Sequence, residues 1–196
     1  MEFDVGPGVL IPRPDTETLI EEALRLVADR KSPLRIADLG TGSGAILVAA
    51  LKEFPNATGE GFEISKPAFD FARANACRLV GERAQIRLAD WNQARGPFDL
   101  VFSNPPYIPF MEMEWLEPDV RNFEPRTALD GGSDGLSAYR SLRELLEKLL
   151  VCGGHALLEI GINQAQAIES LFPNLEIVRI APDLSGVSRC VILRKP

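Results

Sequence analysis

A rigid turn follows the apolar run of residues 98–102 and reads Asn104-Pro105-Pro106-Tyr107. Proline has no backbone N–H and a fixed φ, so this segment cannot continue as the interior of a strand. The asparagine side-chain oxygen and the Pro105 carbonyl are both hydrogen-bond acceptors. Together they can hold the two N–H bonds of a planar –NH2 group, while the Tyr107 ring stacks on that group. The turn therefore predicts chemistry at an amide or aromatic amine nitrogen.

Such a nitrogen is a poor nucleophile because its lone pair is delocalised. Fixed acceptors on its two N–H bonds push the lone pair toward an electrophile. Attack on a sulfonium methyl group then depends on alignment more than on a strong base. We therefore interpret the turn at residues 104–107 as the catalytic and substrate-binding element, and we expect Asn104 to contact the methyl donor as well.

A second candidate site lies between a predicted strand at residues 34–39 and a predicted helix at residues 45–54. The connecting loop is rich in glycine and reads Gly40-Thr41-Gly42-Ser43-Gly44. The order strand, glycine loop, helix is typical of nucleotide-binding units, in which the backbone approaches the ligand closely and a helix N-terminus points at it. With Ala45 the loop also fits the G-x-G-x-x-A dinucleotide fingerprint, so by itself it permits either a dinucleotide or S-adenosylmethionine.

Acidic residues at the ends of the predicted strands separate these two ligands. Glu63 ends the next strand and can hold a ribose, which both ligands contain. Asp38 precedes the glycines, where a carboxylate would repel a pyrophosphate but attract the amino group of S-adenosylmethionine. Asp90 and Trp91 end the third strand and can bind the exocyclic amine and the face of adenine. The set favours the methyl donor.

The remaining chain predicts the scaffold that positions these residues. Residues 1–14 form an irregular lead-in segment, and residues 15–196 form one domain. Residues 103–136 form a long functional loop. Alternating strands and helices indicate a mostly parallel sheet with helices on both faces, whose last two strands are antiparallel neighbours. The predicted helices run from residue 15, over 45–54, from Pro67 to about residue 79, from Ser137 to a stop at Gly153-Gly154, and over 164–172; the predicted strands are 34–39, 57–64, 85–89, 98–102, 155–160, 175–180 and 189–193.

Composition excludes several classes of function. A net charge of −7 argues against DNA binding and against anionic membranes, which need clustered Lys and Arg. The three cysteines and the single histidine have no metal-ligand spacing, so we expect no metal, no disulfide and no Ser-His-Asp triad, and we expect the cysteines to be buried thiols. The chain shows neither a signal peptide nor a long apolar run, which predicts a cytoplasmic protein.

The sequence resembles the HemK/PrmC family of protein-(glutamine-N5) methyltransferases. The similarity covers nearly the whole chain, and the stretch from residue 124 separates this family from DNA-adenine enzymes with the same turn. The resemblance implies a class I S-adenosylmethionine-dependent methyltransferase fold, Rossmann-like, with a seven-stranded sheet and an antiparallel last strand. It also implies methylation of the glutamine of the Gly-Gly-Gln motif in peptide chain release factors. The matching segments are VLIPRPDTE (9–17), the donor loop (38–44), Asp90-Trp91, SNPPYI (103–108) and the stretch from EPRTALDGG (124–132) to Tyr139-Arg140.

Two departures from the family pattern leave alternatives open. The acidic residue after the second strand is Glu63, where the family usually has Asp, and the family's helical N-terminal domain, which docks the release factor, is not in this sequence. We therefore expect a competent but poorly targeted enzyme. The alternatives are an adenine or other amine methyltransferase, an NAD-type dehydrogenase, and a non-catalytic donor-binding module.

Overall fold

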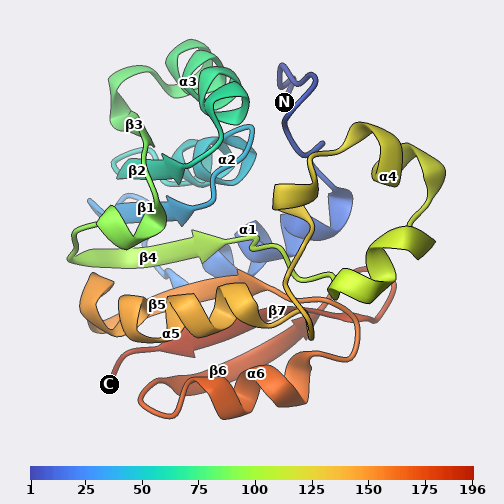
Figure 1. The fold of residues 1–196 in the computed structure, drawn as a ribbon. Coiled ribbons are helices and arrows are strands. Elements are labelled where there is room, and N and C mark those ends of the chain that lie inside the picture. Colours follow the sequence, from blue (N-terminus) through green and yellow to red (C-terminus); the bar gives the residue numbers. More distant parts are fainter.

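The computed structural model describes residues 1–196, which form one seven-stranded sheet with helices on both faces (Figure 1). The strand order is β3-β2-β1-β4-β5-β7-β6. The pairs among β1 to β5 are parallel, and β7 is antiparallel to both of its neighbours. The predicted fold class is therefore confirmed. The strands are β1 (Arg35–Leu39), β2 (Thr58–Glu63), β3 (Ala84–Leu88), β4 (Phe98–Ser103), β5 (Leu150–Glu159), β6 (Glu176–Pro182) and β7 (Ser188–Arg194).

Two hydrophobic cores lie on opposite faces of the sheet, because successive strand residues point to opposite sides. Leu100 and Phe102 of β4 pack in one core with α1 and α2, whereas Val101 packs in the other with α5 and α6. Figure 1 shows α5 and α6 on the near face and α1 behind the sheet. The helices are α1 (Glu17–Leu26), α2 (Ala45–Glu53), α3 (Lys66–Val80), α4 (Pro118–Phe123), α5 (Ser137–Leu149) and α6 (Ala165–Leu171).

The junction between α5 and β5 differs from the prediction. The helix ends at Leu149, and β5 starts at the next residue, so Gly153 and Gly154 lie inside the strand and do not end the helix. Gly153 has φ +78°, a left-handed conformation that glycine adopts without strain. The register against β4 shifts in this region, which is the pattern of a β-bulge. A glycine in a bulge has the same sequence signature as a glycine at a helix end.

The segment after β4 is more ordered than the predicted long loop. It contains α4 and short 3-10 helices at Phe110–Trp115 and Arg126–Ala128. Ile108 pairs with Asp130 in an isolated bridge, which brings the two ends of the segment together. Elements this short show no apolar periodicity, so the sequence pattern could not reveal them.

The N-terminal segment contains no helix or strand before a 3-10 turn at Pro14–Thr16, from which α1 follows. It is held against α3 by Asn75, whose side chain is fully buried. The Asn75 amide accepts from the N–H of Asp4 and donates to the carbonyls of Asp4 and Ser43, at 2.9 to 3.0 Å. One side chain therefore fastens the N-terminal segment to the glycine loop.

The cysteines are only partly as predicted. Cys190 is buried, but Cys77 on α3 and Cys152 on β5 are exposed free thiols. No three His, Cys, Asp or Glu side chains come together as potential metal ligands. None of the helices has the length and apolar character that crossing a bilayer requires.

Candidate active site

A pocket of about 170 Å³ lies at the edge of the sheet where the parallel strands end. Strands β2 and β4 flank β1 there, so the connections after β1 and β4 run to opposite sides of the sheet. In open α/β sheets such a switch point is the usual ligand site. The pocket walls come from the N-terminal segment, the glycine loop, the β2 end and the segment after β4: Gly8–Arg13, Thr16, Gly40–Ser43, Ala45, Ile46, Glu63–Ser65, Ala68, Trp91, Asn104, Pro106, Pro125, Thr127 and Ala128.

The glycine loop takes a conformation that only glycine adopts readily. Gly42 has φ +57° and Gly44 has φ +82°. A Cβ atom at Gly42 would meet nothing within 4 Å, so its side faces open space, whereas one at Gly44 would lie 3.3 Å from Ala72 of α3. The loop therefore presents bare backbone at Gly42 and packs tightly at Gly44.

Four of the five backbone N–H groups of the loop, all but that of Ser43, already donate within the protein. Those of Gly40 and Thr41 donate to the carbonyl of Phe62, and that of Gly42 donates to Oε2 of Glu63 at 2.9 Å. A pyrophosphate bound at a glycine loop needs such N–H groups free. This arrangement argues against a dinucleotide.

Glu63 ends β2 and lines the pocket, although only 8% of its surface is exposed. Its Oε2 atom accepts from Gly42, and its Oε1 atom accepts from the N–H of Ser65 at 2.8 Å. A carboxylate can accept about four hydrogen bonds. Each oxygen of Glu63 thus keeps capacity for one more donor, which is the capacity that a ribose diol requires.

Asp38 is fully buried at the end of β1 and does not line the pocket. Its Oδ2 atom accepts from the hydroxyl of Thr41 at 2.5 Å, and Thr41 does line the pocket. Its Oδ1 atom has no hydrogen-bond partner. Burial raises the pKa of Asp38 to about 7, which outweighs the lowering effect of the Thr41 hydroxyl. A buried carboxyl with an orphaned oxygen therefore lies directly beneath the glycine loop.

Trp91 and Asp90 take different places after β3. Trp91 lines the pocket, and its ring lies 3.4 Å from the position of a Cβ atom on Gly40. The indole N–H donates to Ser141 of α5 at 3.2 Å, which fixes the ring. Asp90 does not line the pocket; its carboxylate accepts from the N–H of Asn92 and caps the short turn there. The pocket wall also includes the apolar side chains of Ile46 and Ile64.

The Asn-Pro-Pro-Tyr turn places its residues in two directions. Asn104 and Pro106 line the pocket, whereas Pro105 and Tyr107 do not. The Nδ2 atom of Asn104 donates to the hydroxyl of Thr16 at 3.3 Å, and no protein group donates to its Oδ1 atom. The Asn104 oxygen is therefore available to a ligand at the edge of the pocket.

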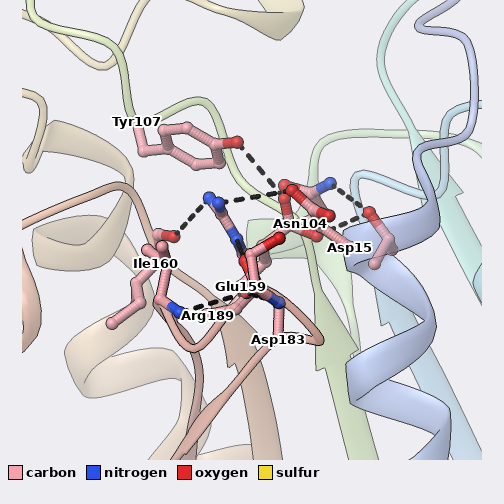
Figure 2. Close-up of polar contacts among 10 residues, drawn as sticks. Asp15, Asn104, Tyr107, Glu159, Ile160, Asp183 and Arg189 are labelled. Carbon is pink, nitrogen blue, oxygen red and sulfur yellow. Dashed lines mark hydrogen bonds and ion pairs between the residues drawn. The ribbon is translucent and has the colours of Figure 1, made fainter.

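Tyr107 points toward the end of β5, as Figure 2 shows. Its hydroxyl donates to Oε1 of Glu159 at 3.2 Å. Burial and the negative charge of Glu159 raise the pKa of Tyr107, so the hydroxyl stays protonated and remains a donor. The stacking role that the sequence predicts for Tyr107 stays a prediction.

Comparison with known proteins agrees with this geometry. Residues 16–114 match the methyltransferase small domain. The release factor glutamine methyltransferase of Bradyrhizobium diazoefficiens is 44% identical over 202 residues, which covers 100% of this chain and 68% of that protein. The enzyme of the same name from Caulobacter vibrioides is 45% identical over 195 residues, covering 97% of this chain and 67% of that protein. The chain belongs to the release factor glutamine methyltransferase family.

Solved structures support the same assignment. The protein-(glutamine-N5) methyltransferase (release factor-specific) of Alicyclobacillus acidocaldarius is 32% identical, with a TM-score of 0.58, and the match covers 99% of this chain and 100% of that one. The ribosomal protein L11 methylase of Lactobacillus delbrueckii has a TM-score of 0.69 at 19% identity, covering 96% of this chain and 82% of that one. At that identity, the second likeness supports the fold alone.

Sequence reasoning missed several residues that build the site of this methyltransferase family member. Thr16 contacts Asn104, and Arg13 forms an ion pair with Glu124 beside the pocket. Asn75 holds the glycine loop from α3, and Glu159 accepts from Tyr107. Arg13 and Thr16 lie in the segment 9–17, and Glu124 lies in the segment 124–132. The match of these two segments to the family pattern was the only signal in the sequence that marked the three residues.

Proposed function

We propose that the chain transfers a methyl group from S-adenosylmethionine to the side-chain amide nitrogen of a glutamine in a peptide chain release factor. The observation that carries the proposal is the free Oδ1 atom of Asn104, which borders the same pocket as the glycine loop. An acceptor at this place suits a substrate that brings N–H donors. The names of the relatives point to the glutamine of a release factor as that substrate.

The residues of the pocket and of the loop fit the ribose, adenine and methionine parts of the proposed donor. Glu63 would accept hydrogen bonds from the ribose hydroxyls, and the Trp91 ring with its apolar neighbours would contact the adenine. Gly42 leaves room for the methionine part, with Thr41 and Ser43 on either side of it. Asp38 lies beneath the loop outside the pocket wall, and a bound ammonium group nearby would favour the ionised form of its carboxyl group. When bound, the donor supplies an electrophilic methyl group on a sulfonium.

The chain's own contribution to the chemistry is orientation. Asn104 Oδ1 and the carbonyl of Pro105 would accept the two N–H bonds of the glutamine amide, which turns the nitrogen lone pair toward the donor. The only charged residues of the pocket wall are Arg13 and Glu63, and Glu63 already accepts two backbone N–H groups. The proposed reaction therefore relies on alignment and hydrogen bonding, and it assigns no strong base.

The proposed unit of activity is the domain at residues 15–196, with residues 1–14 as part of the pocket wall. A methyl-transfer assay on an intact release factor, with mass mapping of the product, tests the function. We expect a mass increase of one methyl group on the peptide that contains the Gly-Gly-Gln glutamine, and none when that glutamine is replaced by asparagine.

A parallel reaction with DNA and RNA tests the alternative that the Asn-Pro-Pro-Tyr turn holds an adenine of a nucleic acid. Methylated adenine without methylated glutamine would overturn the proposal in favour of an amine methyltransferase acting on nucleic acid. Donor binding without any methyl transfer would favour the non-catalytic module.

A further inference from the structure

A buried hydrogen-bonded chain lies behind the Asn-Pro-Pro-Tyr turn (Figure 2). It starts at Glu159, the last residue of β5, which is only 2% exposed. Its Oε2 atom accepts from the hydroxyl of Thr16 at 2.6 Å, and its Oε1 atom accepts from Tyr107. The Thr16 hydroxyl in turn accepts from Asn104 at 3.3 Å. The series of hydrogen bonds therefore runs from Glu159 through Thr16 to the Asn104 side chain at the pocket.

The direction of these hydrogen bonds follows from the number of protons. A hydroxyl group has one proton to donate and two lone pairs. Thr16 donates its proton to the carboxylate of Glu159, so it can offer only a lone pair to Asn104. The Asn104 amide must then turn its Nδ2 atom toward Thr16, which leaves Oδ1 on the other side. A reversed amide would set two oxygens against each other with no proton between them.

We propose that Glu159, acting through Thr16, is a positioning residue that keeps the Asn104 amide turned with its oxygen toward the substrate. The orientation makes the site selective: it accepts a group that donates N–H bonds, as a glutamine amide does, and disfavours a carboxylate of the same shape. This inference rests on the proposed function, because it concerns which end of Asn104 meets the acceptor group.

The charges around Glu159 fit this role. Arg189 lies at the start of the neighbouring strand β7 and is held by Asp183 at 3.2 Å, by Asp15 at 3.3 Å and by the carbonyl of Ile160 at 3.3 Å. Burial raises the pKa of Glu159, and the Thr16 hydrogen bond and the positive charge of Arg189 oppose that effect. Arg189 therefore favours the ionised carboxylate, which can accept from two hydroxyls at once.

Two variants interrupt this series of hydrogen bonds at different points. Thr16→Val keeps the shape of the side chain and removes the hydroxyl, and Glu159→Gln keeps the shape and replaces one acceptor oxygen by a donor. Substitution of a residue that orients a metal-binding side chain from behind typically costs about 10–100-fold in activity, and we take the same scale for the residues behind Asn104. We expect each variant to lower kcat by about tenfold or more, with the KM for the donor within about threefold of the parent. Thr16→Ser should restore most of the rate because it restores the hydroxyl.

Coupling and selectivity separate positioning from loss of structure. The double variant should be no slower than the slower single variant, because both changes break the same chain. A Gly-Gly-Glu peptide should inhibit the parent weakly, and both single variants about fivefold to tenfold more strongly, because a reversed Asn104 amide offers N–H donors to a carboxylate. Glu176→Gln, a change on exposed β6 whose partner is Arg194, is the matched control and should leave all these values unchanged.

A measurement that does not depend on turnover reads the orientation directly. In the parent, the Asn104 side-chain NH2 protons should show a nuclear Overhauser effect to the Thr16 methyl group, and the effect should weaken or vanish in Glu159→Gln. A parent without this effect, additive losses in the double variant, or equal inhibition of parent and variants by the Gly-Gly-Glu peptide would overturn the inference. A parent that shows the effect but methylates no glutamine would instead refute the proposed function and leave the Asn104 orientation established.

Discussion

Arg13 and Glu124 lie 111 positions apart in the chain and form an ion pair beside the pocket. Arg13 belongs to the N-terminal segment, and Glu124 follows α4 in the segment after the Asn-Pro-Pro-Tyr turn. The Glu124 side chain is 4% exposed and its Oε2 atom has no partner, whereas the Arg13 side chain is 40% exposed. Figure 1 shows the two segments side by side. The pair therefore ties together two walls of one pocket.

We expect Arg13→Ala to destabilise the fold, because it leaves the Glu124 carboxylate buried and unpaired. The exposure of Arg13 limits the loss to about 1 kcal/mol of unfolding free energy. Urea denaturation measures the loss, and donor affinity should fall with it. Adding Glu124→Gln to Arg13→Ala should recover most of the stability, because the neutral amide no longer needs the guanidinium. A double variant less stable than Arg13→Ala would contradict this account.

Glu63→Ala should weaken the binding of S-adenosylmethionine at least about tenfold. Each charge-assisted hydrogen bond from a ribose hydroxyl is worth roughly 1.5–3 kcal/mol, and the substitution also frees the N–H groups of Gly42 and Ser65. Titration calorimetry measures the affinity. Glu60→Gln is the control on the same strand, since Glu60 pairs with Arg87 away from the pocket. Unchanged affinity in Glu63→Ala would remove Glu63 from the donor site.

Asn104→Ala should slow methyl transfer much more than it weakens donor binding. The loss of one preorganised contact to the reacting group typically costs about 10²–10³ in rate. Single-turnover measurements with saturating donor report the rate, and calorimetry reports the affinity, which should change only a few-fold. A rate within a few-fold of the parent would show that the Asn104 oxygen does not hold the glutamine amide.

Asp38 should make the stability of the ligand-free protein depend on pH. Its pKa of about 7 lies above the usual aspartate value near 4, so the folded state binds more protons than the unfolded state between these values. The free energy of unfolding therefore falls as the pH rises through this range, by up to a few kcal/mol, and levels off above it. Asp38→Asn should remove this dependence.

Urea denaturation at pH 5 and pH 8 tests the sign. The advantage of Asp38→Asn over the parent should be larger at pH 8 than at pH 5. The same advantage at both values would mean that Asp38 titrates normally. Donor affinity provides the second readout, because the variant should bind S-adenosylmethionine more weakly even where it is the more stable protein.

Asn75→Ala should loosen the N-terminal segment and the glycine loop together. The buried amide serves backbone groups of Asp4 and Ser43, and leaving buried polar groups unpaired costs about 1–3 kcal/mol. Limited proteolysis within the first residues and the donor affinity should change in parallel. Arg78→Ala is the comparison variant one helical turn away. Arg78 is exposed and donates to the Glu2 carbonyl, the Asp4 carboxylate and Oδ1 of Asn75, and its loss leaves the hydrogen bonds between Asn75 and the backbone in place. Cleavage of Arg78→Ala as fast as Asn75→Ala would assign the anchoring to the surface.

Most of the scaffold follows from the sequence for a physical reason. The apolar periods of 2 and 3.6 are local, and parallel strands bring their carboxyl ends to one edge of the sheet. The glycine loop, Glu63, Trp91 and Asn104 each end or follow a strand, so the topology gathers them at one pocket. The same reasoning places Asp90 at the ligand. Its carboxylate accepts from Asn92 in the turn after β3 and is not part of the pocket wall, so its contact with adenine stays a prediction.

The buried polar contacts behind the pocket could not be predicted in this way. Thr16 and Glu159 are 143 positions apart, and Asp4 and Asn75 are 71 apart, so no local pattern connects them. Each is a polar residue in a sequence context that fits a solvated surface equally well. Their burial depends on how α1, α3 and the N-terminal segment pack around the sheet end, which is a property of the whole fold.

The arrangement of the three cysteines allows movements of the pocket wall to be followed with fluorescent labels on natural residues. Cys77 lies on α3 between Asn75 and Arg78, the two residues that hold the N-terminal segment, and its thiol is open to solvent. Cys152 is also open but lies near the beginning of β5, at the end of the strand away from Glu159. Cys190 is sealed in the core, and burial raises the pKa of its thiol. A thiol-reactive fluorophore on Cys77 would follow the pocket wall, and one on Cys152 would serve as its internal reference, without a single engineered residue.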